Sequence, residues 1–367
     1  MFKKFLQKLL RAPVTRLANK LSSAPVKKDV FASLNIVLQA IRKGDTTAGI
    51  MLPYELNTGR FIIFSDQHKG ARDNADDFCL AEKNYSAALD YYYDHEFTFI
   101  NLGDCEELWE NTPEVVMKIN KDILLSEARF LQQNRYYRVF GNHDLEWKYP
   151  FQQKLYLKTV FGDALKIYEG VVLQTQHNNK TYSLFLTHGH QGDKRSDGNP
   201  FSTWIVAAIW TPIQRFLDIN INTISDSFEL VDAHNIMMYE WSATQQQLIF
   251  ISGHTHKPVF ASLDHIDLLT HQLQAAKLTG NKALIGKIEN DLAVYTKQYE
   301  GKKFVKSMAS PSYFNTGCCC YDDGDISGIE IEGGNIRLIK WETKEGFAPV
   351  RIVWQESPLS YLFDQLP

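Results

Sequence analysis

The chain has 367 residues, of which 44% are hydrophobic and 13% aromatic, and its formal net charge is −4. This length allows one large α/β domain with insertions or two modest domains, and the composition is that of a packed globular protein, not a disordered one. The charge provides no excess of Lys and Arg for binding nucleic acid, and no apolar run approaches the ~20 residues that span a bilayer.

The first 28 residues contain Lys and Arg but no Asp or Glu. Apolar residues at helical spacing predict a short basic amphipathic helix before Pro13: they are Phe2, Phe5, Leu6 and Leu9. Three roles are open for this helix, namely packing on its own domain, contact of residues 1–12 with an anionic membrane surface, or a targeting presequence. We expect residues 1–58 to form a basic, helical N-terminal extension.

Five short apolar runs between residues 60 and 256 share one arrangement, in which a β-branched or aromatic run ends in polar residues. The runs are RFIIFSDQH, FTFINLGD, RYYRVFGNHD, YSLFLTHGH and LIFISGHTH. Such runs, bounded by Gly or Asn, are typical of buried strands. Helical segments lie between several of them, as in 75–93 and 120–132. The alternation predicts an α/β sheet whose polar loops gather at the carboxyl ends of its strands.

The polar residues at these ends are carboxylates, imidazoles and one amide: Asp66, His68, Asp104, Asn142, His143, Asp144, His188, His190, His254 and His256. Each motif alone is typical of an ordinary polar strand end. Together they predict a metal site, because mixed oxygen and nitrogen ligands suit manganese, iron or zinc in a catalytic role. Two ions that activate a shared water would favour hydrolysis of a phosphoester or phosphoanhydride.

The series SDQH, GD, GNHD, THGH and GHTH, followed by FNTG, resembles the calcineurin-like metallophosphoesterase family. The resemblance implies an α/β fold with a double-β-sheet core flanked by helices, and a hydrolase with two divalent ions, manganese first and iron or zinc as alternatives. It assigns one ion to Asp66, His68, Asp104 and His256. It assigns the second ion to Asp104, Asn142, His188 and His254, with Asp104 bridging the two.

The same resemblance makes His143 a residue that contacts the phosphate and assists the leaving group, while a hydroxide bridging the ions attacks phosphorus in line. Glu107 is the expected orienting carboxylate of His143, and Asp144 is the competing candidate. Candidate substrate contacts are Asn142, His190 and Arg195. A supporting or merely polar role remains open for His190, and a solvated loop charge for Arg195.

A weaker resemblance concerns the substrate. GDCEELWE, which contains Glu107 and Trp109, and the aromatic segment after THGH are similar to the UDP-2,3-diacylglucosamine diphosphatases of lipid A synthesis. This implies a lipid substrate at a membrane surface and a helical lid over 199–247. That subfamily carries arginine at the position of His143, and its lid aromatics could equally be core residues here. A non-catalytic alternative is a scaffold that binds other proteins. Against it, every metal-ligand position of the family is filled in this sequence.

The remaining segments complete the predicted organisation. Apolar residues at three- and four-residue steps on both sides of TGN predict a helical hairpin over 263–299. SGIEIEGGNIRLIKW predicts a β-hairpin in a second sheet. We expect a metallophosphoesterase domain over 59–357 and a C-terminal tail over 358–367. The oligomeric state stays open.

The five cysteines make a poor disulfide framework, because three of them are consecutive, at 318–320. They indicate reduced thiols, buried on a strand, and a cytoplasmic setting.

Overall fold

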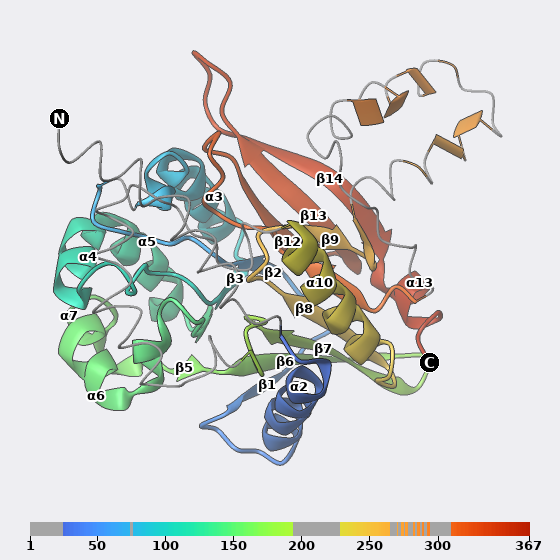
Figure 1. Cartoon of the computed structure of the whole chain (residues 1–367), viewed down its shortest axis with the longest axis horizontal. Helices are drawn as coiled ribbons and strands as arrows, with labels where there is room; N and C mark the ends of the chain where they lie inside the picture. Colours follow the sequence, from blue (N-terminus) through green and yellow to red (C-terminus); the bar gives the residue numbers. More distant parts are fainter. Residues whose placement is uncertain are drawn as a thin grey trace, which may run out of the picture.

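The computed structural model describes residues 25–73, 76–193, 228–264 and 310–367, together with single helical positions between 270 and 293. Two seven-stranded sheets lie face to face, and helices cover the outer face of each (Figure 1). This four-layer arrangement confirms the predicted α/β class with a double-β-sheet core flanked by helices.

The first sheet combines parallel and antiparallel strands in the order β14-β13-β12-β2-β3-β4-β5. Its parallel strands are β2 (Phe61–Phe64), β3 (Thr98–Leu102), β4 (Tyr136–Val139) and β5 (Ile167–Tyr168). The antiparallel strands are β12 (Ile326–Glu332), β13 (Asn335–Glu342) and β14 (Val350–Pro358). The expected hairpin turns at Gly333 and Gly334, whose φ angles of 60° and 78° match the tight turn favoured between two antiparallel strands. Its predicted place in a second sheet is wrong, because β12 pairs with β2 and so extends the sheet of β2–β5.

The second sheet has the order β1-β6-β7-β8-β11-β9-β10. Its strands are β1 (Gly49–Pro53), β6 (Gly170–His177), β7 (Lys180–Thr187), β8 (Leu248–Ser252), β9 (Val259–Phe260), β10 (Leu263–Asp264) and β11 (Tyr313–Asn315). β7, β8 and β11 run parallel to one another, so their carboxyl ends lie at the same edge.

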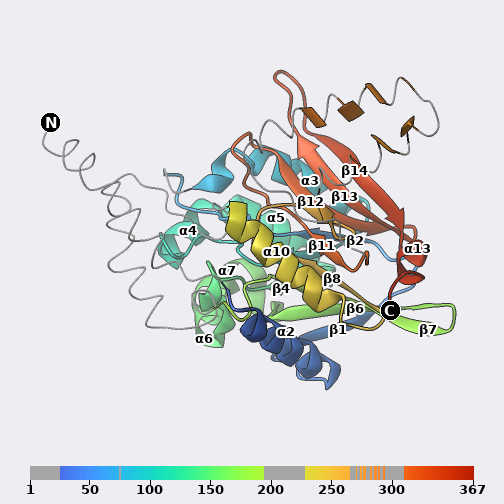
Figure 2. The same cartoon turned by 45° about the vertical axis from the view of Figure 1, so that its right-hand side comes forward.

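The two outer layers are helical. The first sheet is covered by α3 (Glu82–Asp94), α4 (Pro113–Ile119), α5 (Lys121–Gln132), α6 (Pro150–Gln152), η3 (Gln153–Leu157) and α7 (Lys158–Phe161). The second sheet is covered by α2 (Lys27–Arg42) and α10 (Phe228–Ser242), which cross the same face in both views (Figures 1 and 2). Short turns are formed by η1 (Asp77–Cys79), η2 (Leu145–Lys148) and η4 (Gly162–Ala164).

The parallel strands β2 and β3 bury side chains on both faces, which explains their largely apolar sequences. In β2, Ile62 and Phe64 pack against the helical layer, whereas Phe61 and Ile63 pack between the sheets. This alternation follows from the two-residue period of a strand. Full burial of each such side chain contributes about 1.5–3 kcal/mol.

Segments outside the expected 59–357 domain also pack into this body. β1 pairs with β6, and α2 buries Val30, Leu34 and Ile41 against the second sheet. At the other end, α13 (Leu359–Phe363) buries Leu359 and Phe363 between the sheets. Apolar side chains at helical spacing explain this packing. The division of the chain into domains stays a prediction.

The two expected inserts lie only partly within the described residues. α10 occupies the end of the 199–247 lid, whose first part, like the basic helix of residues 1–12, lies outside them. The described positions of the 263–299 hairpin between 270 and 293 are helical, and Ala276 packs against Ile288. Among the residues described, no helix is both long and apolar enough to cross a membrane.

The consecutive cysteines are buried and carry free thiols, as expected. Their predicted position on a strand is wrong. Residues 318–320 follow β11 in a loop, because Gly317 turns the chain with a φ of 75°.

Glu330 anchors a buried group of charges on the first sheet. Its side chain, 1% exposed, accepts hydrogen bonds from the Tyr92 hydroxyl at 2.8 Å, from Arg337 at 2.9 Å and from Arg351 at 2.8 Å. Arg337 has a second partner at the surface, Glu356, at 2.7 Å, whose side chain is 44% exposed.

We predict that Glu330→Gln lowers the free energy of unfolding by about 3 kcal/mol, because it leaves two arginines beside a neutral amide in a buried position. The matched change Glu356→Gln should cost about 1 kcal/mol at most, because exposed ion pairs contribute little. Urea denaturation of both variants measures the difference. Equal losses would contradict the role given to Glu330.

Candidate metal centre

The predicted ligands follow five strands that come from both sheets. The strand ends are those of β2 (Asp66, His68), β3 (Asp104), β4 (Asn142), β7 (His188) and β8 (His254, His256). β2, β3 and β4 are parallel in one sheet, and β7 and β8 are parallel in the other. The fold therefore delivers all seven side chains to one edge of the sandwich, the edge where open α/β sheets carry their sites.

Five of these seven residues have a left-handed backbone. Their φ angles are 53° at Asp66, 51° at His68, 50° at Asp104, 70° at His254 and 55° at His256. Such conformations cost about 1–3 kcal/mol each in residues other than glycine and collect at functional sites. Hydrogen bonds between the ligand loops hold them: the His68 N–H donates to the Asp104 carbonyl at 3.0 Å, and the His254 N–H donates to the Asp66 carboxylate at 3.0 Å.

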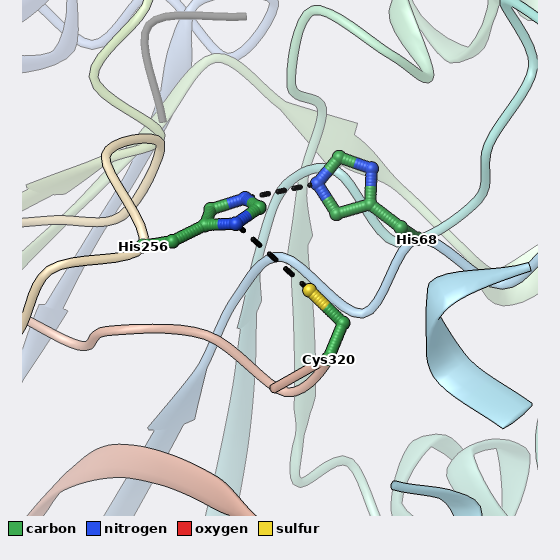
Figure 3. Close-up of side chains that lie close together, drawn as sticks. All are labelled: His68, His256 and Cys320. Atoms are coloured by element: carbon green, nitrogen blue, oxygen red, sulfur yellow. Dashed lines mark hydrogen bonds between the residues drawn. The ribbon is translucent and has the colours of Figure 1, made fainter. Parts of the chain in front are cut away.

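The first group of side chains contains Asp66, His68 and His256, with Asp104 beside them. The Nε2 atoms of His68 and His256 lie 3.1 Å apart (Figure 3), and His256 Nε2 lies 3.3 Å from Asp66 Oδ1. Asp104 Oδ2 lies 3.7 Å from His68 Nε2. These are the four residues that the family resemblance assigns to one ion.

The second group lies on the other side of Asp104. The same Asp104 Oδ2 is 3.1 Å from His188 Nε2, which is 3.2 Å from Asn142 Oδ1. A ligand atom of His254 lies within 4.8 Å of both Asp104 and His188. One oxygen of Asp104 thus lies between the two groups.

The donor atoms fit divalent cations. His68 Nδ1 faces a carboxylate, so its Nε2 presents a lone pair towards His256 Nε2. Two nitrogens that bind one ion at about 2.0–2.1 Å can approach each other to about 3 Å. His254 Nε2 is buried with no hydrogen-bond partner among the described residues, a costly arrangement unless the atom binds something. Burial alone would lower the pKa of His188, but Asp104 and Asp66 raise it to about 9, so the local field favours positive charge.

Two motif glycines permit the close approach of the ligand loops. A Cβ atom at Gly141 would collide with the Asp104 carboxylate, and one at Gly253 would collide with Ser65 Oγ and the Asp66 carboxylate. Glycine is the residue that lets a backbone pass so near to other groups. The glycines of GNHD and GHTH are therefore part of the site.

His143 is held between Glu107 and Trp109. Its Nδ1 donates to Glu107 Oε2 at 2.7 Å, and the Trp109 ring stacks on its imidazole with centroids 3.9 Å apart. The same Glu107 oxygen lies 3.0 Å from His68 Nδ1. Burial alone would lower the pKa of His143, but Glu107 and Asp104 raise it to about 9. The neighbouring carboxylates therefore favour the protonated form of His143, beside the first group of ligands.

Asp144, the competing candidate for orienting His143, lies elsewhere. Its carboxylate accepts hydrogen bonds from the backbone N–H of Gly141 at 2.6 Å and of Cys105 at 3.0 Å. It also lies 3.5 Å from Arg138. Asp144 therefore connects the loops that follow β3 and β4, and Glu107 is the carboxylate that faces the imidazole.

Two further buried carboxylates, Glu106 and Glu127, lie next to these loops, and their negative charges are paired with Arg138 and Lys69. Glu106 pairs with Arg138 and accepts a hydrogen bond from Trp147 at 2.8 Å. Lys69 lies 3.5 Å from Glu106 and 2.7 Å from Glu127. All of these charges are buried, so the group supports the ligand loops and does not hold a cation.

The remaining predicted substrate contacts are placed differently. His190 is fully buried, its ring centroid is 5.4 Å from that of His188, and burial lowers its pKa to about 3. This position lies behind a ligand, so contact with a substrate would require the ring to be uncovered. Arg195 lies outside the described residues.

Three further contacts were not identified from the sequence. His234 on α10 donates from Nε2 to the Gly189 carbonyl at 2.8 Å and lies beside His254. Cys320 Sγ lies 4.0 Å from His256 Nδ1 (Figure 3). Ser65 Oγ lies 2.6 Å from the Thr316 hydroxyl. The sequence pointed to Thr316, because it belongs to the FNTG motif that extends the family resemblance. It did not point to His234 or Cys320, because neither belongs to a polar cluster that directly follows an apolar strand.

Comparisons with known proteins find matches among solved structures. No protein-family model matches the chain, and no curated protein matches it. Matching solved structures include vacuolar protein sorting 29 from Cryptosporidium parvum (12% identity, TM-score 0.31, covering 82% of this chain and 98% of that one). They also include a dimetal phosphatase from Danio rerio (10% identity, TM-score 0.34, covering 82% of this chain and 100% of that one). A third match is a putative 5′-nucleotidase from Staphylococcus aureus (12% identity, TM-score 0.31, covering 82% of this chain and 54% of that one). These scores are too low to transfer a function.

We predict that Glu107→Gln moves the basic limb of the pH–rate profile to lower pH. A protonated His143 is lost as pH rises through its pKa of about 9, and removal of the neighbouring negative charge lowers that pKa. Initial rates between pH 6 and pH 10 measure the shift, with metal content determined at each pH because Glu107 also contacts His68. An unchanged basic limb with full metal content would contradict the pairing.

Proposed function

We propose that the chain is a hydrolase of phosphoester or phosphoanhydride bonds that depends on two divalent metal ions. The observation that carries the proposal is the position of Asp104, whose Oδ2 lies 3.7 Å from His68 and 3.1 Å from His188. One carboxylate oxygen between two sets of imidazoles, with further oxygen ligands on each side, suits a pair of neighbouring ions.

In this proposal the first ion is held by Asp66, His68, Asp104 and His256, and the second by Asp104, Asn142, His188 and His254. Manganese fits this oxygen and nitrogen donor set, and iron and zinc are the alternatives. When bound, the ions would activate a water molecule for attack on phosphorus and neutralise charge on the phosphoryl oxygens.

The protein's own residues would assist departure of the leaving group. His143, whose protonated form Glu107 and Asp104 favour, lies beside the ligands and would donate its proton to the leaving oxygen. Glu107 holds the imidazole through Nδ1, which leaves Nε2 as the donor. Trp109 covers one face of the ring and fixes its orientation.

A phosphorylated small molecule is the proposed substrate class, and a phosphorylated lipid at a membrane surface is the second candidate. Exposed apolar side chains on α4, α6 and η3 favour the lipid: Val115 (41% exposed), Ile119 (39%), Phe151 (73%) and Leu155 (52%). Exposed lysines lie among them, including Lys118 and Lys154. This combination suits an anionic lipid surface. We propose a cytoplasmic setting, with residues 1–12 as a further candidate for membrane contact.

A panel of substrates tests the proposal. It contains p-nitrophenyl phosphate, bis(p-nitrophenyl) phosphate, nucleoside diphosphates and UDP-diacylglucosamine, each with Mn²⁺. We predict turnover by the wild type, loss of metal and turnover in Asp104→Ala, and a 10²–10⁴-fold lower kcat with full metal content in His143→Asn, roughly the range for general acid catalysis.

His95→Asn is the matched control, because His95 is an exposed histidine at the end of α3. It should leave kcat unchanged. Absence of metal and turnover in the wild type, together with stoichiometric binding of a protein partner, would instead identify a scaffold.

A further inference from the structure

Each imidazole that binds a metal through one nitrogen has a second nitrogen that must be held by the protein. Such outer partners fix the orientation of the ring and are usually carboxylates, backbone carbonyls or water. His68 Nδ1 meets Glu107 at 3.0 Å, and His188 Nδ1 donates to the Leu102 carbonyl at 3.0 Å. Both of these ligands follow the usual pattern.

His256 has a different partner. Its Nε2 points to His68 and Asp66, and its Nδ1 lies 4.0 Å from Cys320 Sγ. Figure 3 shows the ring with one nitrogen directed at His68 and the other at Cys320. When Nε2 binds a cation, Nδ1 carries the proton, and the sulfur is a weak acceptor for it. Cys320 thus occupies the place of an outer partner at Nδ1.

The loop that carries Cys320 is attached to the metal ligands at two further points. The Cys319 N–H donates to the Asp66 carbonyl at 3.0 Å, and the Tyr321 hydroxyl donates to the His256 carbonyl at 3.3 Å. Cys320 itself is 8% exposed. Its sulfur is therefore kept at the imidazole by the hydrogen bonds of both neighbouring residues, through the Cys319 N–H and the Tyr321 hydroxyl.

His256 has the greatest need of such a partner among these three imidazoles. Its side chain is 24% exposed, compared with 5% for His68 and 0% for His188. Fewer packed neighbours leave more rotational freedom, which a ring must lose when it binds an ion. A contact at Nδ1 reduces that loss before the ion arrives.

We propose that Cys320 is a positioning residue for the metal centre, which orients His256 through Nδ1 and thereby raises the affinity for the ion shared by His68 and His256. The inference rests on the proposed two-metal function. It assigns Cys320 a positioning role through Nδ1 of His256, distinct from direct ligation of the ion, for which its distance of at most 4.8 Å from ligand atoms of His68 and His256 is also short enough.

Equilibrium dialysis of Mn²⁺ against the full chain tests this role without measuring activity. We predict that Cys320→Ala weakens binding of one of two ions about tenfold, the lower end of the range for loss of an outer partner, because sulfur is a weak acceptor. Cys320→Ser keeps an acceptor and should recover part of the affinity. Cys319→Ala is the matched control, because its sulfur faces the Ser327 carbonyl at 3.8 Å, away from His256.

The outcomes separate the role of Cys320 from the proposed function. Two ions in the wild type with wild-type affinity in Cys320→Ala would overturn the role of Cys320 alone. Equal weakening in Cys319→Ala, or no recovery in Cys320→Ser, would also overturn it and indicate a general effect on the loop. Absence of ions from the wild type would overturn the two-metal function together with this role.

Discussion

The whole site depends on keeping carboxylates and imidazoles buried next to one another at the edge of two sheets. Removing such groups from water is costly unless each one is paired and hydrogen-bonded. The chain meets this requirement largely with its own backbone: the His254 N–H donates to Asp66, and the His143 N–H donates to Asp104 at 2.8 Å. Each bond joins two ligand loops, so the interactions that stabilise the charges also fix the loops.

The same constraint explains why the loops are strained and glycine-rich. Left-handed residues such as Asp66 and His256 turn their side chains towards a common point, and Gly141 and Gly253 let neighbouring loops approach. Lys69 and Arg138 form buried ion pairs with Glu127 and Glu106 next to the loops. These pairs satisfy the buried charges in place of water. The same hydrogen bonds and ion pairs thus hold the strand-end loops against one another.

Much of this arrangement could be predicted from the sequence because strand ends obey simple rules. A buried parallel strand has a continuous apolar sequence, and the polar residue that follows it must lie at the carboxyl edge, which placed Asp104 and His188 correctly. The choice between Glu107 and Asp144 as the partner of His143 could not be made, because it depends on how two loops fold over each other. Cys320 and His234 reach the site from a loop and a helix, through contacts that no local pattern encodes.

The local sequence pattern also could not predict which segments at the two ends pack into the folded body. β1 has the sequence GIMLP, whose glycine and proline disfavour a strand, and only its pairing with β6 includes it in the fold. Helical spacing in α2 indicates an apolar face, but it does not say what covers that face. Long-range packing decides both.

The most direct test of the two-metal centre is anomalous diffraction from crystals of the protein grown with Mn²⁺. We expect two peaks on either side of the Asp104 carboxylate, one bound by His68 and His256 and the other by His188 and His254. A single peak, or two peaks that do not share Asp104, would contradict it.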